Sequence, residues 1–344
     1  MPIFMIGTQR SGSNMLRLML NQLPALAAPH PPHIMERMAP LLSIYGELAA
    51  DAAFAQLIED VCRLVELNPV SWDGVILQRD QVAAGCRERS LIAVYGAVYD
   101  IMARDWGAQD WLCKSLTNVY YLPTITAYYP QAKFIYLYRD GRDVAASFKK
   151  AVVGEKHSFH LAKTWHGEQQ LSIQARRSID PARFFMVSYE QLTGAPEHTL
   201  QALCVFLEQP YSRAMLEFNR SEEAQRTAHA GTLWCNVTKP VMTRPLQSFL
   251  DHLDTTDIRI FETVAGISLD QLGYARCLVQ PDEAQPFSAA DLAGFDAENR
   301  RLKAAFKLSL SADERRLREP QEQLLAAIAA RRPVLSDNHA AGAS

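Results

Sequence analysis

The sequence of 344 residues predicts an α/β fold: a parallel sheet flanked by helices in a three-layer sandwich, with a C-terminal helical extension. Short apolar runs at 3–6, 111–114, 133–138 and 183–187 alternate with segments of helical periodicity. Strands separated by helices need crossover connections, which make the sheet parallel and cover both of its faces. Polar clusters follow several of these runs, where ligands of such folds bind.

The first twenty residues carry the most informative pattern. Ile3 to Ile6 is typical of a strand buried on both faces, and residues 15–20 have one apolar helical face. The segment between them reads Gly7-Thr8-Gln9-Arg10-Ser11-Gly12-Ser13-Asn14. Because a glycine-rich turn at a helix N-terminus directs backbone N–H groups toward one point, we predict a site for a phosphate-like anion on a P-loop-NTPase-like fold.

The spacing of Gly7 and Gly12 is that of a nucleotide triphosphate loop, but the residues that follow are not. Such a loop continues with Lys for the outer phosphates and Ser or Thr for Mg²⁺. Ser13 and Asn14 stand there instead, and the cation, Arg10, lies inside the loop. The loop therefore lacks the parts expected for ATP with magnesium. An ordinary polar turn between a strand and a helix is the alternative.

The remaining elements follow in order. Four prolines at 24–32 exclude a helix and predict a rigid loop. Helices are expected at 39–66, 91–104, 122–129, 144–148, 160–177, 199–207 and 257–272. Residues 219–248 contain few periodic apolar positions and predict a long loop, which in compact domains is usually functional.

The pattern predicts three parts. Residues 1–280 form the α/β domain, residues 281–332 form the helical extension, and residues 333–344 form a disordered tail. A helix at 311–330 is expected to be interrupted at Pro320. We expect the extension to pack on the domain or on a partner, which leaves a homo-oligomer through these helices open.

Composition limits the function. A net charge of −3 argues against a general nucleic-acid binder, so no nucleic-acid partner is expected. The six cysteines form no C-x-x-C pair and predict free thiols in a reducing compartment. There is no apolar run of about 18 residues, so no transmembrane segment is expected. The first strand starts at once and leaves no room for a signal peptide, so we expect a cytoplasmic protein.

A second candidate anion site follows the strand at 133–138. Arg139 ends that strand and Ser147 lies on the next helix, so a guanidinium and a hydroxyl can bind one anion from two sides. In isolation, local salt bridges among Arg139, Asp140, Arg142 and Asp143 explain the pattern as well. Beside the Arg10 loop, a second clamp implies a ligand with two anionic ends.

Together these motifs resemble the sulfotransferases that use 3′-phosphoadenosine 5′-phosphosulfate (PAPS). Residues 8–14 resemble the family's 5′-phosphosulfate loop, and residues 138–147 resemble its 3′-phosphate motif. Ser188-Tyr189-Glu190-Gln191-Leu192 is similar to the segment whose tyrosine lies near the adenine. The resemblance covers about residues 1–275.

The resemblance implies metal-independent, in-line transfer of the sulfuryl group from PAPS to a hydroxyl or amine. Arg10 is then the catalytic cation at the bridging oxygen, and the segment Ser11-Gly12-Ser13-Asn14 holds the 5′-phosphate. Arg139 and Ser147 bind the 3′-phosphate, Tyr189 lies near the adenine, and Arg244 is a further candidate contact with Lys239 and Trp234. No metal ligands are expected.

The general base is less well defined. Where many family members have a histidine after the lysine, this chain has Leu116 in Lys114-Ser115-Leu116. The region after the first helix offers His30, His33 and Glu36 instead, of which we favour Glu36 and place His33 second. Lys114 is expected near the transferring group, as in the family.

Two alternatives stay open. One is a phosphotransferase or nucleotide-binding protein of the wider phosphate-loop class, which Ser13 and Asn14 disfavour as a Mg-ATP enzyme. The other is a catalytically inactive module that binds 3′-phosphoadenosine 5′-phosphate (PAP). The acceptor, whether a small molecule, a glycan or a lipid, is not specified by any residue pattern.

Overall fold

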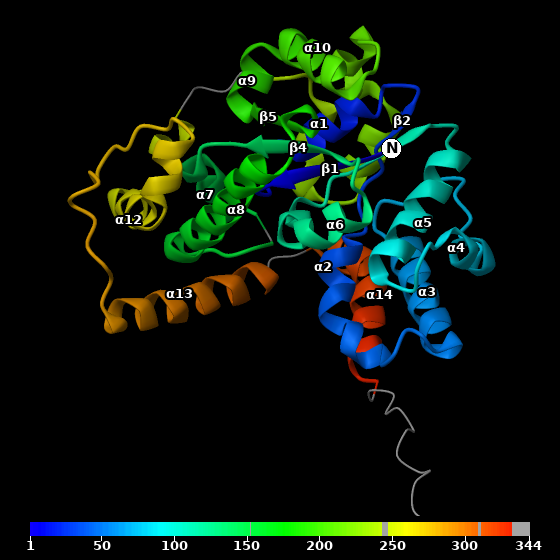
Figure 1. Cartoon of the computed structure of the whole chain (residues 1–344). Helices are drawn as coiled ribbons and strands as arrows, with labels where there is room; N and C mark the ends of the chain where they lie inside the picture. The colour runs from blue at the N-terminus through cyan, green and yellow to red at the C-terminus, as the bar shows by residue number, and fades with distance from the viewer. Residues whose placement is uncertain (152, 243–246, 309–310, 332–344) are drawn as a thin grey trace, which may run out of the picture.

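The computed structural model describes residues 1–151, 153–242, 247–308 and 311–331 of the chain. Its centre is one parallel sheet in the order β2-β3-β1-β4-β5 (Figure 1). The strands are β1 (Pro2–Gly7), β2 (Leu26–Ala27), β3 (Asp110–Cys113), β4 (Lys133–Tyr138) and β5 (Phe184–Ser188). The predicted parallel α/β fold is confirmed.

The strand order creates a switch point at the middle of the sheet. From β1 the chain builds β2 and β3 on one side, then crosses to build β4 and β5 on the other. β1 pairs with β4 from Ile3↔Lys133 to Gly7↔Leu137, so both strands end at one edge. Because the connections diverge there, a crevice opens beyond the carboxyl ends of β1 and β4.

Helices cover both faces of the sheet (Figure 1). Those before β4 are α1 (Ser13–Leu20), α2 (Ile34–Met38), α3 (Asp51–Glu66), α4 (Arg79–Gly85), α5 (Leu91–Asp105) and α6 (Leu122–Tyr128). Those after it are α7 (Gly141–Lys149), α8 (Ser158–Ser178), α9 (Tyr189–Gly194), α10 (Pro196–Leu207), α11 (Glu222–His229), α12 (Thr255–Gln271), α13 (Ala289–Leu308) and α14 (Ala312–Ala329). Short 3-10 helices lie at Ala39–Tyr45, Leu116–Tyr121, Pro181–Arg183, Arg213–Arg220, Thr232–Thr238 and Ser248–Asp251.

The alternation of side chains along β1 divides the core. Phe4 and Ile6 pack into the cluster built with α3 and α5, whereas Ile3 and Met5 pack into the cluster built with α1 and α10. All four side chains are fully buried. The central strand is therefore covered on both faces, as its unbroken apolar run predicts.

Three local expectations are wrong. The prolines at 24–32 exclude a helix, as predicted, but the segment is not a loop throughout, because β2 forms at Leu26–Ala27 and pairs with β3. Much of the expected loop at 219–248 is helical, in α11 and the 3-10 helix Thr232–Thr238. Pro320 does not interrupt its helix, because α14 runs through it.

The two C-terminal helices lie against different parts of the domain. On α13, Asn299 accepts hydrogen bonds from the backbone N–H groups of Lys156 (2.9 Å) and His157 (3.1 Å). α14 lies beside α3 (Figure 1), where Leu324 and Ile328 join the larger core cluster. The residues predicted as a disordered tail lie outside the described ranges.

Within the described residues, none of the helices combines the length and the apolar character that crossing a membrane requires. The six cysteines, all in the described ranges, are free thiols.

Candidate active site

The predicted site residues follow the ends of neighbouring strands at one edge of the sheet. Arg10 belongs to the loop after β1, Lys114 follows β3, Arg139 follows β4 and Tyr189 follows β5. Because the strands are parallel, their carboxyl ends place these four residues around one crevice.

The loop after β1 has an unusual backbone. Gly12 has φ of 87° and precedes α1, where its carbonyl accepts the Leu16 N–H at 3.0 Å. A Cβ at Gly12 would lie 2.6 Å from the Tyr189 ring, so only glycine lets that ring approach. Arg10 has φ of 71°, a strained value for a residue with a side chain. Such strain is typical of functional loops.

Arg10 and Ser147 are in direct contact. The Arg10 Nε donates to the Ser147 Oγ over 3.0 Å. Arg139 donates from Nη1 to the Arg10 carbonyl at 3.2 Å, and its guanidinium lies 4.4 Å from the centre of the Tyr189 ring. The two predicted anion sites are therefore adjacent.

Several polar atoms around the loop are buried with no hydrogen-bond partner in the structure. These are the Ser11 Oγ, the Asn14 Oδ1 and the Arg139 Nε. The Arg139 side chain is 7% exposed, and its nearest carboxylate, Asp143, is 3.9 Å away. Of these polar atoms the Ser11 hydroxyl and the Arg139 Nε can donate, and a bound anion would satisfy both, whereas the Asn14 Oδ1 is an acceptor and needs a donor. The residues present thus fit a ligand with phosphate groups.

A pocket of about 160 Å³ lies between these groups. Its lining includes Arg10, Gly12, Ser13, Asn14, Arg139, Ser147 and Tyr189, together with Phe218, Trp234, Lys239 and Met242 from the segment 213–242. We call it the donor pocket. Trp234 and Lys239, which the sequence suggested as contacts, do line it. Arg244 lies outside the described residues.

A second pocket of about 320 Å³ adjoins the first, because Arg10 and Trp234 line both. Lys114, His30, His33 and Glu36 line it, and we call it the acceptor pocket. The three candidates for general base and the candidate lysine therefore share one cavity on the far side of Arg10.

Lys114 is nearly buried in this cavity. Burial, together with the positive charges of Arg17 and Arg10, lowers its pKa from 10.5 to about 7, although Cys113 and Glu36 act in the opposite direction. An anion in either pocket would favour the charged form of this lysine.

His33 and Glu36 form a pair at the start of α2. The His33 Nδ1 lies 3.3 Å from the Glu36 Oε2 and 3.2 Å from the Ser115 Oγ. The Thr117 hydroxyl also donates to Glu36, at 2.9 Å. Burial raises the pKa of Glu36, but the hydrogen bond and charge of His33, with Thr117 and Arg37, more than offset it and lower the pKa overall. Burial also lowers the pKa of His33, and Glu36 opposes that shift. The neutral imidazole is thus oriented by a carboxylate.

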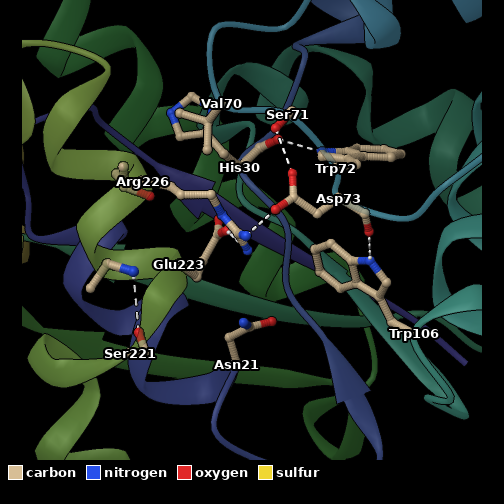
Figure 2. Close-up of polar contacts among 12 residues, drawn as sticks. Asn21, His30, Val70, Ser71, Trp72, Asp73, Trp106, Ser221, Glu223 and Arg226 are labelled. Carbon is tan, nitrogen blue, oxygen red and sulfur yellow. Dashed lines mark hydrogen bonds and ion pairs between the residues drawn. The ribbon is translucent and has the colours of Figure 1, made fainter.

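His30 is held firmly by its backbone. Its carbonyl accepts a hydrogen bond from the Trp72 Nε1 at 2.8 Å (Figure 2). It also accepts one from the Asn68 Nδ2 at 3.1 Å. The ring packs edge-on against Trp234, and neither ring nitrogen has a hydrogen-bond partner in the structure. Burial and the charges of Lys114 and Arg17 lower its pKa well below 6.5, so the ring is neutral.

The segment that carries Trp234 is anchored through α11. Arg17 on α1 is fully buried and bonds Glu223 (2.7 Å) and Thr227 (2.9 Å) on that helix. On the far side, Arg226 pairs with Asp73, whose carbonyl accepts from the Trp106 Nε1 at 2.9 Å (Figure 2). These contacts attach α11, which precedes Trp234, to α1 on one side and to the loop that contains Asp73 on the other.

Sequence patterns missed one wall of the acceptor pocket. Arg37, Arg318, Gln321, Glu322 and Leu325 also line it. Four of the five belong to α14, in the predicted helical extension, for which the sequence indicated no site residue. Among the described residues, no group of three or more His, Cys, Asp or Glu side chains has an arrangement that could hold a metal ion.

Comparison with known proteins assigns the class. A model of the sulfotransferase family matches residues 2–213. An uncharacterized protein of Aquifex aeolicus is 26% identical over 235 residues, which are 66% of this chain and 28% of that protein. A putative protein-tyrosine sulfotransferase of Caenorhabditis briggsae is 29% identical over 198 residues, 55% of this chain and 70% of that protein.

A solved structure has the same fold. The sulfotransferase domain from the curacin biosynthetic pathway covers 80% of this chain and 98% of its own length, with a TM-score of 0.50 and 22% identity. The chain belongs to the sulfotransferase family. The family is one of transferases, and its reaction is the transfer of a sulfuryl group. The chain spans about a quarter of the length of its Aquifex aeolicus relative.

Proposed function

We propose that this enzyme transfers the sulfuryl group of PAPS to a hydroxyl or amine of an acceptor. The observation that carries the proposal is the contact between Arg10 and Ser147, which brings two predicted anion sites into one pocket. PAPS has a 5′-phosphosulfate and a 3′-phosphate, so it needs two such sites.

The donor pocket supplies a partner for each part of this cosubstrate. The loop from Ser11 to Asn14 would hold the 5′-phosphate, and its buried Ser11 hydroxyl has no other partner in the structure. Arg139 would bind the 3′-phosphate, with Ser147 beside it. Tyr189, which stacks on Arg139, would lie near the adenine.

Arg10 lies between the two pockets, where charge builds up on the leaving phosphate oxygen as the bond to sulfur breaks. Fixed cations at such a position stabilise the transition state most. Lys114 would act from the acceptor pocket on the same developing charge. The reaction forms a bond from the acceptor oxygen or nitrogen to sulfur and releases PAP.

We further propose that His33 takes the proton of the acceptor and that Glu36 orients it. Glu36 already accepts hydrogen bonds from Thr117 and His33, which makes it a poor base. With Glu36 at Nδ1, the His33 Nε2 is left to accept a proton. This reverses the sequence-based preference for the general base, in which Glu36 came first and His33 second.

Ligand-induced stabilisation tests the donor. PAP should raise the melting temperature far more than AMP or ATP with Mg²⁺, because only PAP has the 3′-phosphate. Equal shifts from all three would contradict the proposal, and a larger shift from Mg-ATP would favour a phosphotransferase. Stabilisation by PAP without transfer of labelled sulfate to any acceptor would favour an inactive PAP-binding module.

A further inference from the structure

The outer wall of the acceptor pocket comes from α14, which lies beyond the residues that the family model matches. This helix is firmly attached. Ile328 is fully buried, the Gln321 Nε2 donates to the Leu64 carbonyl at 2.7 Å, and Arg331 pairs with Asp60. Because α14 is attached by these contacts, its side chains have fixed positions in the pocket and can discriminate between acceptors.

Arg318 on α14 is the residue whose surroundings point to a ligand. Its guanidinium lies 5.7 Å from the centre of the Trp234 ring, at the boundary of the two pockets. Its Nε and Nη2 atoms are buried and have no hydrogen-bond partner in the described structure. A guanidinium has five donors and cannot lose its charge, so it needs an acceptor. His30 lines the same cavity and is also buried, and neither of its ring nitrogens has a partner among the described residues.

The carboxylates of the pocket do not meet this need. Glu36 is engaged by His33 and Thr117. Glu322 lies one turn along α14 but forms no ion pair with Arg318 within the described residues. Arg37, the other arginine on this side, donates to Gln321. Arg37, Arg318, Glu36 and Glu322 thus line one side of the pocket, and among these four described residues Arg318 is the one whose buried donors still need an acceptor.

We propose that the acceptor is a hydroxyl compound that carries an anionic group such as a carboxylate, and that Arg318 binds this group. The proposal rests on the proposed function. The hydroxyl would then face Lys114 and His33, and the Trp234 ring would lie along the body of the molecule. In this arrangement α14 determines acceptor specificity and takes no part in binding the donor.

Matched acids and amides test it without knowledge of the natural acceptor. We would compare 4-hydroxyphenylacetate with 4-hydroxyphenylacetamide, and 4-hydroxybutanoate with 4-hydroxybutanamide, by transfer of labelled sulfate from PAPS. Each pair differs in charge at nearly constant shape. For the pair that is accepted, the unmodified enzyme should favour the acid in kcat/KM by about tenfold or more, since a charge-assisted hydrogen bond contributes this much.

Arg318→Gln should reduce this preference to nearly one and leave PAP binding unchanged. Arg318→Lys should keep part of it. Arg316→Gln is the matched control, because Arg316 lies on the same helix and is 81% exposed; it should retain the full preference.

An acid preference that survives in Arg318→Gln would overturn the proposal, as would a preference for the amides. Failure of all four compounds to accept sulfate, in an enzyme that PAP still stabilises, would overturn it too. Absence of PAP stabilisation would instead contradict the donor assignment, so the two failures are distinguishable.

Discussion

The Nε of Arg10 donates a hydrogen bond to the Oγ of Ser147 across 137 residues of sequence, and this contact joins the two motifs of the donor pocket. The two residues come from loops after adjacent strands, β1 and β4, whose carboxyl ends meet at the switch point of the sheet. The contact holds the loop after β1 against α7, at the edge where the two strands end. Five predictions follow from this arrangement and from the pocket beside it.

Arg139→Ala should weaken PAP binding by about ten- to hundredfold and remove the preference for PAP over AMP. The guanidinium is the buried cation assigned to the 3′-phosphate, and a charge-assisted hydrogen bond contributes about 1.5–3 kcal/mol. Calorimetric titration with both nucleotides measures the effect. Arg220→Ala, which removes a guanidinium that is 77% exposed, is the control. A variant of Arg139 that still prefers PAP would refute the assignment.

Arg10→Gln should lower the rate of sulfate transfer by about 10²–10³-fold, the usual cost of removing one transition-state donor. PAP binding should fall much less, because the backbone N–H groups of the loop remain. Single-turnover transfer measured beside PAP titration separates the two effects. Parallel losses in both measurements would mean that Arg10 binds the ground state and has no special role in transfer.

His33→Ala should lower turnover by about 10²–10⁴-fold with PAP binding intact, as expected for loss of a general base. Glu36→Gln should have a smaller effect, since an amide oxygen can still accept from the His33 Nδ1. Steady-state kinetics of both variants decides between them. A larger loss in Glu36→Gln would return the role of base to Glu36.

Lys114→Met should change how stability depends on pH. The unfolded chain binds a proton on this lysine up to about pH 10.5, whereas the folded chain releases it near pH 7. Stability of the unmodified enzyme therefore rises with pH across this window, and the penalty of charging the buried lysine is complete below pH 7.

The stability gained by Lys114→Met should accordingly be largest below pH 7 and shrink toward pH 10. Urea unfolding at several pH values, without ligand, measures the difference. Lys163→Met, at an exposed lysine, should show no such trend. A constant difference across the range would argue against a buried, uncharged Lys114.

Ile328→Ala should destabilise the whole domain by about 2–5 kcal/mol, because it leaves a cavity where α14 joins the main core. Leu308→Ala is the matched control, since Leu308 is 81% exposed and should change stability little. Unfolding followed by circular dichroism tests this. A near-zero effect of Ile328→Ala would mean that α14 is not part of the cooperative unit.

The central sheet, and the grouping of Arg10, Arg139 and Ser147 at one edge of it, could be predicted because their signals are local. An unbroken apolar run such as Ile3–Ile6 fits a strand covered on both faces, and Gly12 has the conformational freedom that its φ requires. Arg139 and Ser147 could be paired because strand ends in a parallel sheet converge. None of this needs knowledge of distant contacts.

The structure of segment 219–248 and the position of Arg318 could not be predicted, because both depend on contacts between distant parts of the sequence. The segment 219–248 reads as a loop because α11 is short and polar, and its stability comes from Arg17, which bonds Glu223 and Thr227. No periodicity reveals a buried ion pair between residues 206 positions apart. Arg318 has no motif around it in the sequence, because only the packing of α14 against α3 brings it to the acceptor pocket.

The two pockets are completed at different points along the chain as it is synthesised. The described lining of the donor pocket is complete in the chain by Met242, whereas the acceptor pocket waits for residues 318–325. In the proposed function, the residues assigned to the donor are therefore synthesised before the residues of α14 that are assigned to the acceptor. A polypeptide that ended between these points would contain the described lining of the donor pocket, but it would lack the wall proposed to select the acceptor and the core side chains Leu324 and Ile328.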